Sequence, residues 1–388
     1  MADRKSLTIL GSTGSIGTQA LDVVTRNPER FAVRALSAGG NQPQLLAQQA
    51  AAFGVEVVSI SDDSHVPALR AALSEAGSHA EIIAGPQAAS QVAGLGTDIV
   101  LNGVTGSVGL GPTLAALNAG STLALANKES LVVGGQLVKG ALQRDDQLVP
   151  VDSEHSAMAQ SLRGGRRSEV TKFVLTASGG PFRGWTREQM GSVTREQALA
   201  HPTWSMGPVV TINSSTLMNK GLELIEAHLL FDVPTADIEV VVHPQSVIHS
   251  MIEFRDGCTM AQASPPDMRL PIALALAWPE RVDSGATPVD WSSAHTWTFE
   301  PLDNELFPAV NLARAAVDAS ATHPAVYNAA NEECVNAFLA GRIRYLDIVP
   351  TVERVLADHD GIRGTLHLED VLEVERWART RAHELMPA

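Results

Sequence analysis

The sequence predicts an α/β protein that begins with a doubly wound parallel sheet, continues with an α+β domain and ends with a helical domain. Three observations support this prediction. Short β-rich runs alternate with helical patterns up to about residue 151, the texture then becomes strand-rich, and from residue 308 the pattern is helical almost to the end. Alternation of strands and helices is typical of a doubly wound sheet.

The N-terminal domain is expected over residues 1–151, and its strands are short apolar runs separated by helical patterns. In order, these runs are LTIL at 7–10, FAVRALSA at 31–38, VEVVSI at 55–60, EIIAG at 81–85, DIVLNGV at 98–104 and TLALAN at 122–127.

A second, catalytic domain is expected over residues 152–281. It contains KFVLTASGGPF and a strand-rich stretch, IEVVVHPQSVIHSMIEFRDGCTMAQAS, in which Asp-Gly predicts a hairpin turn. Residues 282–307 lack periodicity and are expected to be a linker, and residues 308–388 to form the helical domain.

Composition limits the class of protein. A chain of 388 residues suggests two or three domains. Its net charge of −15 argues against nucleic acid as the main partner, because phosphate backbones are bound by clustered Lys and Arg. Two cysteines exclude a disulfide framework. Without an apolar signal region or a run long enough to span a membrane, a cytoplasmic protein with no membrane association is expected.

A glycine turn follows the first predicted strand and precedes a helical pattern. GSTGSIG places glycines at Gly11, Gly14 and Gly17, and the position of the turn favours a Rossmann-like dinucleotide site. Glycine lets the backbone approach a pyrophosphate, and the helix offers unpaired N–H groups. A turn kept only for packing is the alternative interpretation.

The second predicted strand runs into LSAGGNQPQ, where an NAD-binding protein would carry an acidic residue for the ribose 2′-hydroxyl. The stretch has no acid, which favours NADP over NAD. It also has no Arg or Lys for a 2′-phosphate.

Asp152 and Glu154 stand one residue apart directly after the apolar LVPV. On an extended segment the two side chains would project to the same side and converge, which suits a cation. The alternative is a helix start, with Asp152 or Ser153 as N-cap and Glu154 near the positive end of the helix dipole.

Three further stretches concentrate polar residues between apolar runs: TASGGPF, HPTWSMG and NSSTLMNKGLE. A small anionic substrate needs such a set of hydroxyl, amide and ammonium groups. Taken singly, Ser178 reads as a turn residue, Ser214 or Ser215 as a cap and Lys220 as a solvated charge.

Together these motifs carry a resemblance. GSTGSIG, LALANKES, VPVDSEHSA, TASGGPFRGW, HPTWSMG, NSSTLMNKGLE, HPQSVIHS and SPPDMRLPI occur in this order, with NAANEE in the helical C-terminus. The set closely resembles the 1-deoxy-D-xylulose 5-phosphate reductoisomerases, over nearly the whole chain. The resemblance implies an NADPH-dependent oxidoreductase of the non-mevalonate isoprenoid pathway that forms 2-C-methyl-D-erythritol 4-phosphate with Mg²⁺, Mn²⁺ or Co²⁺.

The resemblance also implies the role of each site residue. Spacing alone does not choose between Glu223 and Glu226, and the family motif selects Glu223. The implied metal ligands, which are also catalytic, are Asp152, Glu154 and Glu223; Lys128 and His201 are the other implied catalytic residues. The implied substrate-binding residues are Lys128, Ser153, Glu154, Ser178, His201, Trp204, Ser214, Asn219, Lys220 and Glu223. The implied cofactor-binding residues are Thr13, Gly14, Ser15, Ile16, Gly39, Asn41, Gln42, Asn127, Glu129, Met206 and Gly207.

The family mechanism gives these groups their purpose. The metal acts as a Lewis acid while the carbon skeleton rearranges, NADPH then reduces the branched aldehyde, and a lid beginning at His201 and Trp204 excludes water. One departure stands out: many members carry Lys where this chain has Gly40, which leaves Ser37, Asn41, Gln42 or backbone groups for the 2′-phosphate.

Two rival functions are a plain NADP-dependent sugar-phosphate dehydrogenase without isomerisation and a non-enzymatic NADPH sensor. The first leaves the Asp-Ser-Glu site without a purpose, and the second conflicts with the intact Asp152, Glu154, Glu223, His201 and Lys220. A homodimer is expected, because the β-rich VVVHPQSVIHSMIEF segment has an edge that needs covering.

Overall fold

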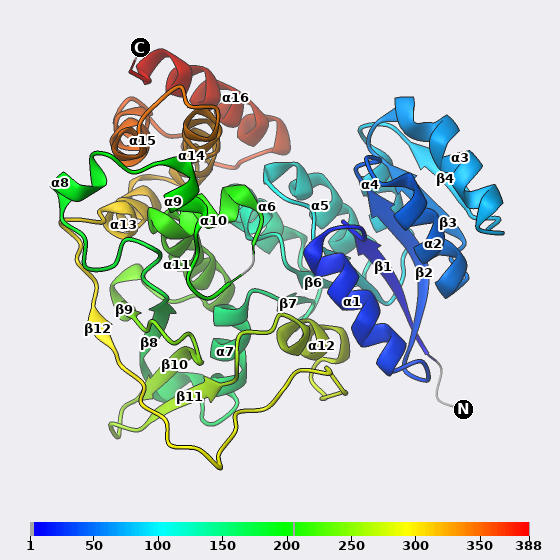
Figure 1. The fold of residues 1–388 in the computed structure, drawn as a ribbon, viewed down its shortest axis with the longest axis horizontal. Helices are drawn as coiled ribbons and strands as arrows, with labels where there is room; N and C mark the ends of the chain where they lie inside the picture. The colour runs from blue at the N-terminus through cyan, green and yellow to red at the C-terminus, as the bar shows by residue number, and fades with distance from the viewer. Residues whose placement is uncertain (1–3, 205, 388) are drawn as a thin grey trace. The chain divides into compact units, whose positions relative to one another are not determined.

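The computed structural model describes residues 4–204 and 206–387, shown in Figure 1. Its contacts divide into two compact units. The first holds the chain up to Ser130 with Val138–Ser156 and Asp267–Thr287; the second holds Leu131–Leu137, Ala157–Pro266 and the chain from Pro288.

The first unit contains a seven-stranded parallel sheet in the order β4-β3-β2-β1-β5-β6-β7. The strand order reverses direction at β1, where β2 lies on one side and β5 on the other, as in a doubly wound fold. All six predicted strands are present and β7 is added: β1 Lys5–Leu10, β2 Phe31–Ala38, β3 Val57–Ile60, β4 Glu81–Ala84, β5 Ile99–Asn102, β6 Thr122–Leu125 and β7 Leu148–Pro150.

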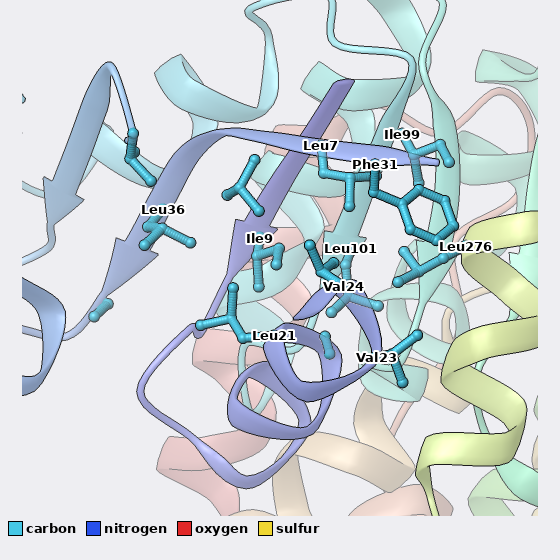
Figure 2. Close-up of a cluster of buried hydrophobic side chains, with 14 of the residues drawn as sticks. Leu7, Ile9, Leu21, Val23, Val24, Phe31, Leu36, Ile99, Leu101 and Leu276 are labelled. Carbon is cyan, nitrogen blue, oxygen red and sulfur yellow. The ribbon is translucent and has the colours of Figure 1, made fainter. Parts of the chain in front are cut away.

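Helices connect these strands and bury their apolar sides on the sheet. Figure 2 shows the core beside β1, where side chains of α1 meet those of β1, β2 and β5. The helices are α1 Ser15–Arg26, α2 Pro43–Phe53, α3 Val66–Glu75, α4 Ala88–Ala93, α5 Leu110–Asn118, α6 Lys128–Ala141, which bends at Gly135, and α7 Ser153–Leu162, whose first turn belongs to this unit.

Helix α12 (Arg269–Ala277) also belongs to the first unit, although the sequence placed residues 152–281 in a single catalytic domain. Ile272 and Leu276 are fully buried in the core beside β1, and Figure 2 shows Leu276 in the same cluster as Phe31. Arg269 adds an ion pair to Asp22 of α1. The helix is apolar nearly all round, so its sequence pattern does not reveal the sheet on which it packs.

The second unit is built on a mixed sheet in the order β11-β10-β8-β9-β12. Strands β8 and β9 are parallel, and β10 is antiparallel to both β8 and β11. The predicted Asp-Gly hairpin is confirmed between β10 and β11, where Gly257 has φ +84°. The bounds are β8 Val170–Ala177, β9 Ile238–Val242, β10 Ile248–Phe254, β11 Thr259–Ala263 and β12 Glu300–Pro301.

Strand β12 lies within the stretch that was expected to be only a linker. Glu300 and Pro301 pair with Val242 and Val241 along the outer edge of β9. Nearer the start of β9, the Arg314 guanidinium donates to the carbonyl oxygen of Ile238 at 2.5 Å. The linker and the helix that follows it therefore cover this edge of the sheet, a pairing that depends on contacts distant in the sequence.

The C-terminal region is helical, as predicted, and belongs to the second unit. In the described residues no helix is both long and apolar enough to cross a membrane. The remaining helices are α8 Arg187–Met190, α9 Arg195–Leu199, α10 Pro208–Ser215, α11 Met218–Phe231, α13 Ala309–Ala319, α14 His323–Leu339, α15 Ile348–Ala357 and α16 Leu368–Leu385.

Candidate active site

The glycine turn of the first unit has the geometry that a pyrophosphate needs. Gly11 has φ +77°, and a Cβ there would lie 2.6 Å from the carbonyl oxygen of Gly103. A Cβ on Gly17 would lie 2.3 Å from the oxygen of Gly11. Gly14 is the N-cap of α1 and no side chain caps the helix, so its first N–H groups face the turn. The residues predicted to bind the cofactor here are Thr13, Gly14, Ser15 and Ile16.

The other site residues predicted in this unit also follow strand ends. Gly39, Asn41 and Gln42 come after β2, Asn127 to Glu129 after β6, and Asp152 to Glu154 after β7. In a parallel sheet these ends share one edge, and ligands bind there at the reversal of strand order. The arrangement fits a dinucleotide laid across the edge.

Asn127 supports this edge through its own side chain. Its amide oxygen accepts from the backbone N–H of Ser130 at 2.8 Å, which caps α6, and its amide nitrogen donates to the Gly106 oxygen at 2.8 Å. It therefore ties the loop after β5 to the start of α6. Lys128 and Glu129 follow in the first turn of that helix.

Asp152 and Glu154 present their carboxylates together, but not on an extended segment. Helix α7 begins at Ser153, so the expectation of two alternating strand positions was wrong and the helix-start alternative describes the backbone. The two side chains nevertheless place carboxylate oxygens within 4.8 Å of each other. The Ser153 hydroxyl donates to Glu154 at 2.5 Å. Two acidic groups this close favour a cation.

Lys128 supplies a positive charge to this pair. Its ammonium lies 2.5 Å from Asp152, and the two side chains are only 11% and 10% exposed. Burial alone would raise the pKa of Asp152, but the Lys128 ammonium and the His155 imidazole hold that pKa well below its usual range. The carboxylate is therefore ionised at neutral pH, which is the state that a metal ligand requires. His155, 3.3 Å from Asp152, was not predicted, although it stands inside the DSEHS motif.

The second unit contains a matching ion pair on α11. Lys220 forms an ion pair with Glu223 one turn later, and the two side chains are 5% and 2% exposed. Asn219 also donates to Glu223, at 2.5 Å. The reading of Lys220 as a solvated surface charge was therefore wrong. Glu226 is fully buried on the same helix, so burial does not distinguish it from Glu223.

His201 links the start of the predicted lid to Ser178. Its Nδ1 accepts from the backbone N–H groups of Thr203 at 3.1 Å and Trp204 at 2.9 Å. Nε2 therefore carries the proton and donates to the Ser178 hydroxyl at 3.1 Å. Burial lowers the pKa of His201, which keeps the imidazole neutral.

The rest of the predicted lid lies between this turn and α10. The half-buried Trp204 ring stands 6.0 Å edge-on from His249. Ser205, within the HPTWSMG motif, lies outside the described residues. Met206 is half-buried, and Gly207 is the N-cap of α10.

Two buried side chains from the C-terminal helices hold the end of α10. Asn331 donates to the side-chain oxygen of Asn213 at 2.9 Å, and Tyr345 donates to the Ser215 carbonyl at 2.6 Å. The Ser215 hydroxyl bonds back to its own helix, as a structural residue would, whereas Ser214 is half-buried beside it. The contacts join residues 118 and 130 positions apart in the sequence, so no local pattern predicts them.

The structure thus sorts the predicted residues into two sets. Asp152 and Glu154, with Lys128 and the nucleotide edge, are in the first unit; Glu223 is in the second with the other substrate residues. In the second unit these residues are Ser178, His201, Trp204, Ser214, Asn219 and Lys220.

Comparison with known proteins identifies the family. A model described as 1-deoxy-D-xylulose 5-phosphate reductoisomerase matches residues 7–135, and two models of C-terminal domains of the same family match residues 148–231 and 263–381. The reductoisomerase of Beutenbergia cavernae is 65% identical, covering 98% of this chain and 97% of the relative. That of Pseudarthrobacter chlorophenolicus is 61% identical, covering 98% of both.

Solved structures agree. The reductoisomerase of Zymomonas mobilis in complex with NADPH has a TM-score of 0.91 at 42% identity and covers all of both chains. A reductoisomerase in complex with NADPH, fosmidomycin and magnesium has a TM-score of 0.91 at 36% identity over 98% of each chain. The chain therefore belongs to the 1-deoxy-D-xylulose 5-phosphate reductoisomerase family.

Proposed function

We propose that this protein converts 1-deoxy-D-xylulose 5-phosphate to 2-C-methyl-D-erythritol 4-phosphate, with NADPH and a divalent cation. Relatives of this chain have been crystallised with NADPH and with magnesium. Skeletal rearrangement precedes the hydride transfer, and the reaction belongs to the non-mevalonate isoprenoid pathway.

The observation that carries this proposal is the presence of a buried lysine–carboxylate pair in each unit, Lys128 with Asp152 and Lys220 with Glu223. Burying an ion pair costs several kcal/mol per ion in desolvation, and such pairs rarely add stability. Buried ionisable groups with a specific charge partner are candidates for functional sites. Each pair joins a proposed metal ligand to a proposed substrate lysine, so a metal and an anionic substrate can each replace one member.

We assign the divalent cation to Asp152, Glu154 and Glu223, whose oxygen atoms suit Mg²⁺ or Mn²⁺. When bound, the cation supplies Lewis-acid stabilisation of charge that develops on the substrate oxygens. The Ser153 hydroxyl and the Lys128 ammonium orient the sugar hydroxyls. Both lie beside the carboxylates, since Ser153 donates to Glu154 and Lys128 pairs with Asp152.

The substrate phosphate is assigned to the second unit. Ser178, Ser214, Asn219 and Lys220 supply hydroxyl, amide and ammonium donors, which form strong hydrogen bonds to an anion. His201 fixes the Ser178 hydroxyl and anchors the lid, which excludes water from the rearranging carbon skeleton. The N-terminal domain, up to residue 151, carries NADPH on its strand-end loops, with Met206 and Gly207 near the nicotinamide.

The test is to incubate the protein with NADPH, Mn²⁺ and 1-deoxy-D-xylulose 5-phosphate, follow the loss of NADPH absorbance, and identify the product by NMR. We expect a branched product that forms only when the metal is present. A linear reduced sugar phosphate, formed without metal, would establish a plain dehydrogenase instead. NADPH binding without any product would support the sensor.

Assembly and location complete the proposal. We expect a homodimer, although not through the VVVHPQSVIHSMIEF segment, because its strands β9 and β10 are paired on both sides. The edge that needs covering is β11, which carries the partly exposed Met260. We also assign the protein to the cytoplasm, in line with its two cysteines, which are too few for a disulfide framework. Light scattering at micromolar concentration tests the dimer, and a monomer there would contradict it.

A further inference from the structure

Two loops at the nucleotide edge of the first unit lie side by side. Strands β2 and β3 are paired in register up to Ala38 and Ile60, so the loops that follow them leave the sheet together. The Ser61 hydroxyl donates to the Gly39 oxygen at 3.3 Å and joins the two loops. In a Rossmann-like fold the loop after the second strand meets the ribose of the nucleotide.

Gly40 and His65 are fitted to each other across these loops. Gly40 has φ +106°, and a Cβ on it would lie 2.6 Å from His65 Nδ1 and 3.2 Å from His65 Cβ. Any side chain at residue 40 would therefore displace the imidazole. The glycine that stands where many relatives have a lysine leaves room for a different basic group.

His65 carries a buried polar atom that the described residues leave unsatisfied. Its Nδ1 is shielded from solvent and has no hydrogen-bond partner, although the ring as a whole is half-buried. Because this atom is covered by the protein beside Gly40, any contact with a ligand must come from the partly exposed remainder of the side chain.

His65 is also the only basic side chain that the sequence places in residues 37–42 and 61–66. The two charged neighbours on its own turn are acidic. Asp62 accepts from the Ser64 N–H at 2.9 Å, and an Asp63 oxygen lies 3.1 Å from the Cβ position of Gly85 after β4. Both carboxylates repel phosphate, so an anion at this edge needs a positive group to offset them.

We propose that His65 recognises the 2′-phosphate of NADPH and sets the preference of this enzyme for NADPH over NADH. The inference rests on the proposed function, which makes NADPH the cofactor. A hydrogen bond from an imidazole N–H to a phosphate is among the strong ones.

The test compares cofactor binding by the full chain and its variants. Fluorescence titrations with NADPH and NADH, and calorimetry with 2′,5′-ADP and 5′-AMP, measure the affinities. We expect His65→Ala to weaken the binding of NADPH and 2′,5′-ADP about ten-fold and to leave the binding of NADH and 5′-AMP unchanged. His65→Lys should keep the preference for NADPH.

His79→Ala is the matched control, because His79 is exposed and precedes β4 at the opposite edge of the same sheet. It should leave every affinity unchanged. Equal loss of NADPH and NADH in His65→Ala would show a structural role, and no loss of either would show no role; either result overturns the inference.

The binding test is independent of turnover. If the selectivity depends on His65 but no branched product forms, the proposed function fails while this inference stands. If the branched product forms and His65→Ala keeps its preference for NADPH, this inference alone fails.

Discussion

Asn331 of α14 donates a 2.9 Å hydrogen bond to the side-chain oxygen of Asn213 in α10, and the two residues are 0% and 3% exposed. Ser214, a proposed phosphate ligand, is the next residue. We expect Asn331→Ala to lower the free energy of unfolding by about 1–3 kcal/mol, because the Asn213 oxygen loses its buried partner. The substrate KM should rise several-fold while the affinity for NADPH is unchanged.

Urea denaturation and steady-state kinetics measure the two effects. Asn336→Ala is the control, since Asn336 is exposed on the same helix. A loss of stability with an unchanged KM would show that Asn331 supports only the packing of the second unit.

Asp152→Asn and Glu223→Gln should each abolish turnover and leave NADPH binding nearly intact. Each change keeps the shape of the side chain but removes a negative charge that the metal needs. Fluorescence titration measures the affinity for NADPH, and the NADPH absorbance assay measures turnover. The control is Asp145→Asn, because Asp145 is an exposed residue of the first unit. It should change neither turnover nor the affinity for NADPH. A large loss of NADPH affinity in either site variant would contradict the assignment.

Lys220→Ala should raise the substrate KM about ten-fold or more, because a charged hydrogen bond to a charged partner contributes about 1.5–3 kcal/mol. The kcat should fall as well, since phosphate binding helps to drive closure of the lid. Kinetics at saturating Mg²⁺ measure both. The control is Lys172→Ala, whose side chain is 42% exposed and lies 3.8 Å from Glu239. An unchanged KM would remove Lys220 from the phosphate site.

Trp204→Ala should abolish activity while the melting temperature hardly changes, and Trp204→Phe should be mild. A core tryptophan would instead lose about 3–5 kcal/mol on truncation. Trp185→Ala is the comparison, because Trp185 is also half-buried but packs 5.0 Å from the core residue Phe182. Calorimetry measures the melting temperatures of Trp204→Ala and Trp185→Ala. A strongly destabilised Trp204→Ala protein would reject the lid assignment.

Stability should fall in mild acid through the His323–His359 pair, whose rings lie 4.8 Å apart. Burial lowers the pKa of His323; burial and then the charge of His323 lower that of His359, although Asp360 opposes this. The unfolded chain, with histidine pKa values near about 6.5, therefore binds more protons than the folded one. The stabilising contribution is complete above that value and is lost as the pH falls through the lowered pKa values.

Urea denaturation at neutral and acidic pH measures this slope. His359→Gln should reduce it, whereas His295→Gln, at an exposed histidine of the same unit, should not. Equal slopes in the unaltered protein and both variants would place the acid sensitivity elsewhere.

Local patterns were enough to predict the first sheet, because a short apolar run such as FAVRALSA, bounded by turn residues, specifies its own strand. They were not enough for α12, which is apolar nearly all round and packs on a sheet far away in sequence. The pairing of β12 with β9 also depends on a contact between distant segments.

The candidate site shows the same division. Spacing and resemblance predicted Asp152 and Lys220 as site residues, but a sequence does not show that a lysine is buried against a carboxylate. The fit between Gly40 and His65 needs two loops that only the sheet brings together. The sequence alone showed only that Gly40 stands where many members of the family have a lysine.

The covering of β9 by Glu300, Pro301 and Arg314 has a consequence for assembly. On that side the sheet ends in β12, a strand of only two residues, whereas β11 on the other side is an edge strand of five residues. Two copies that pair through β11 would each use the longer edge of their own sheet, which makes a closed contact. A two-residue strand offers little backbone to a further copy, so this sheet opposes growth into filaments.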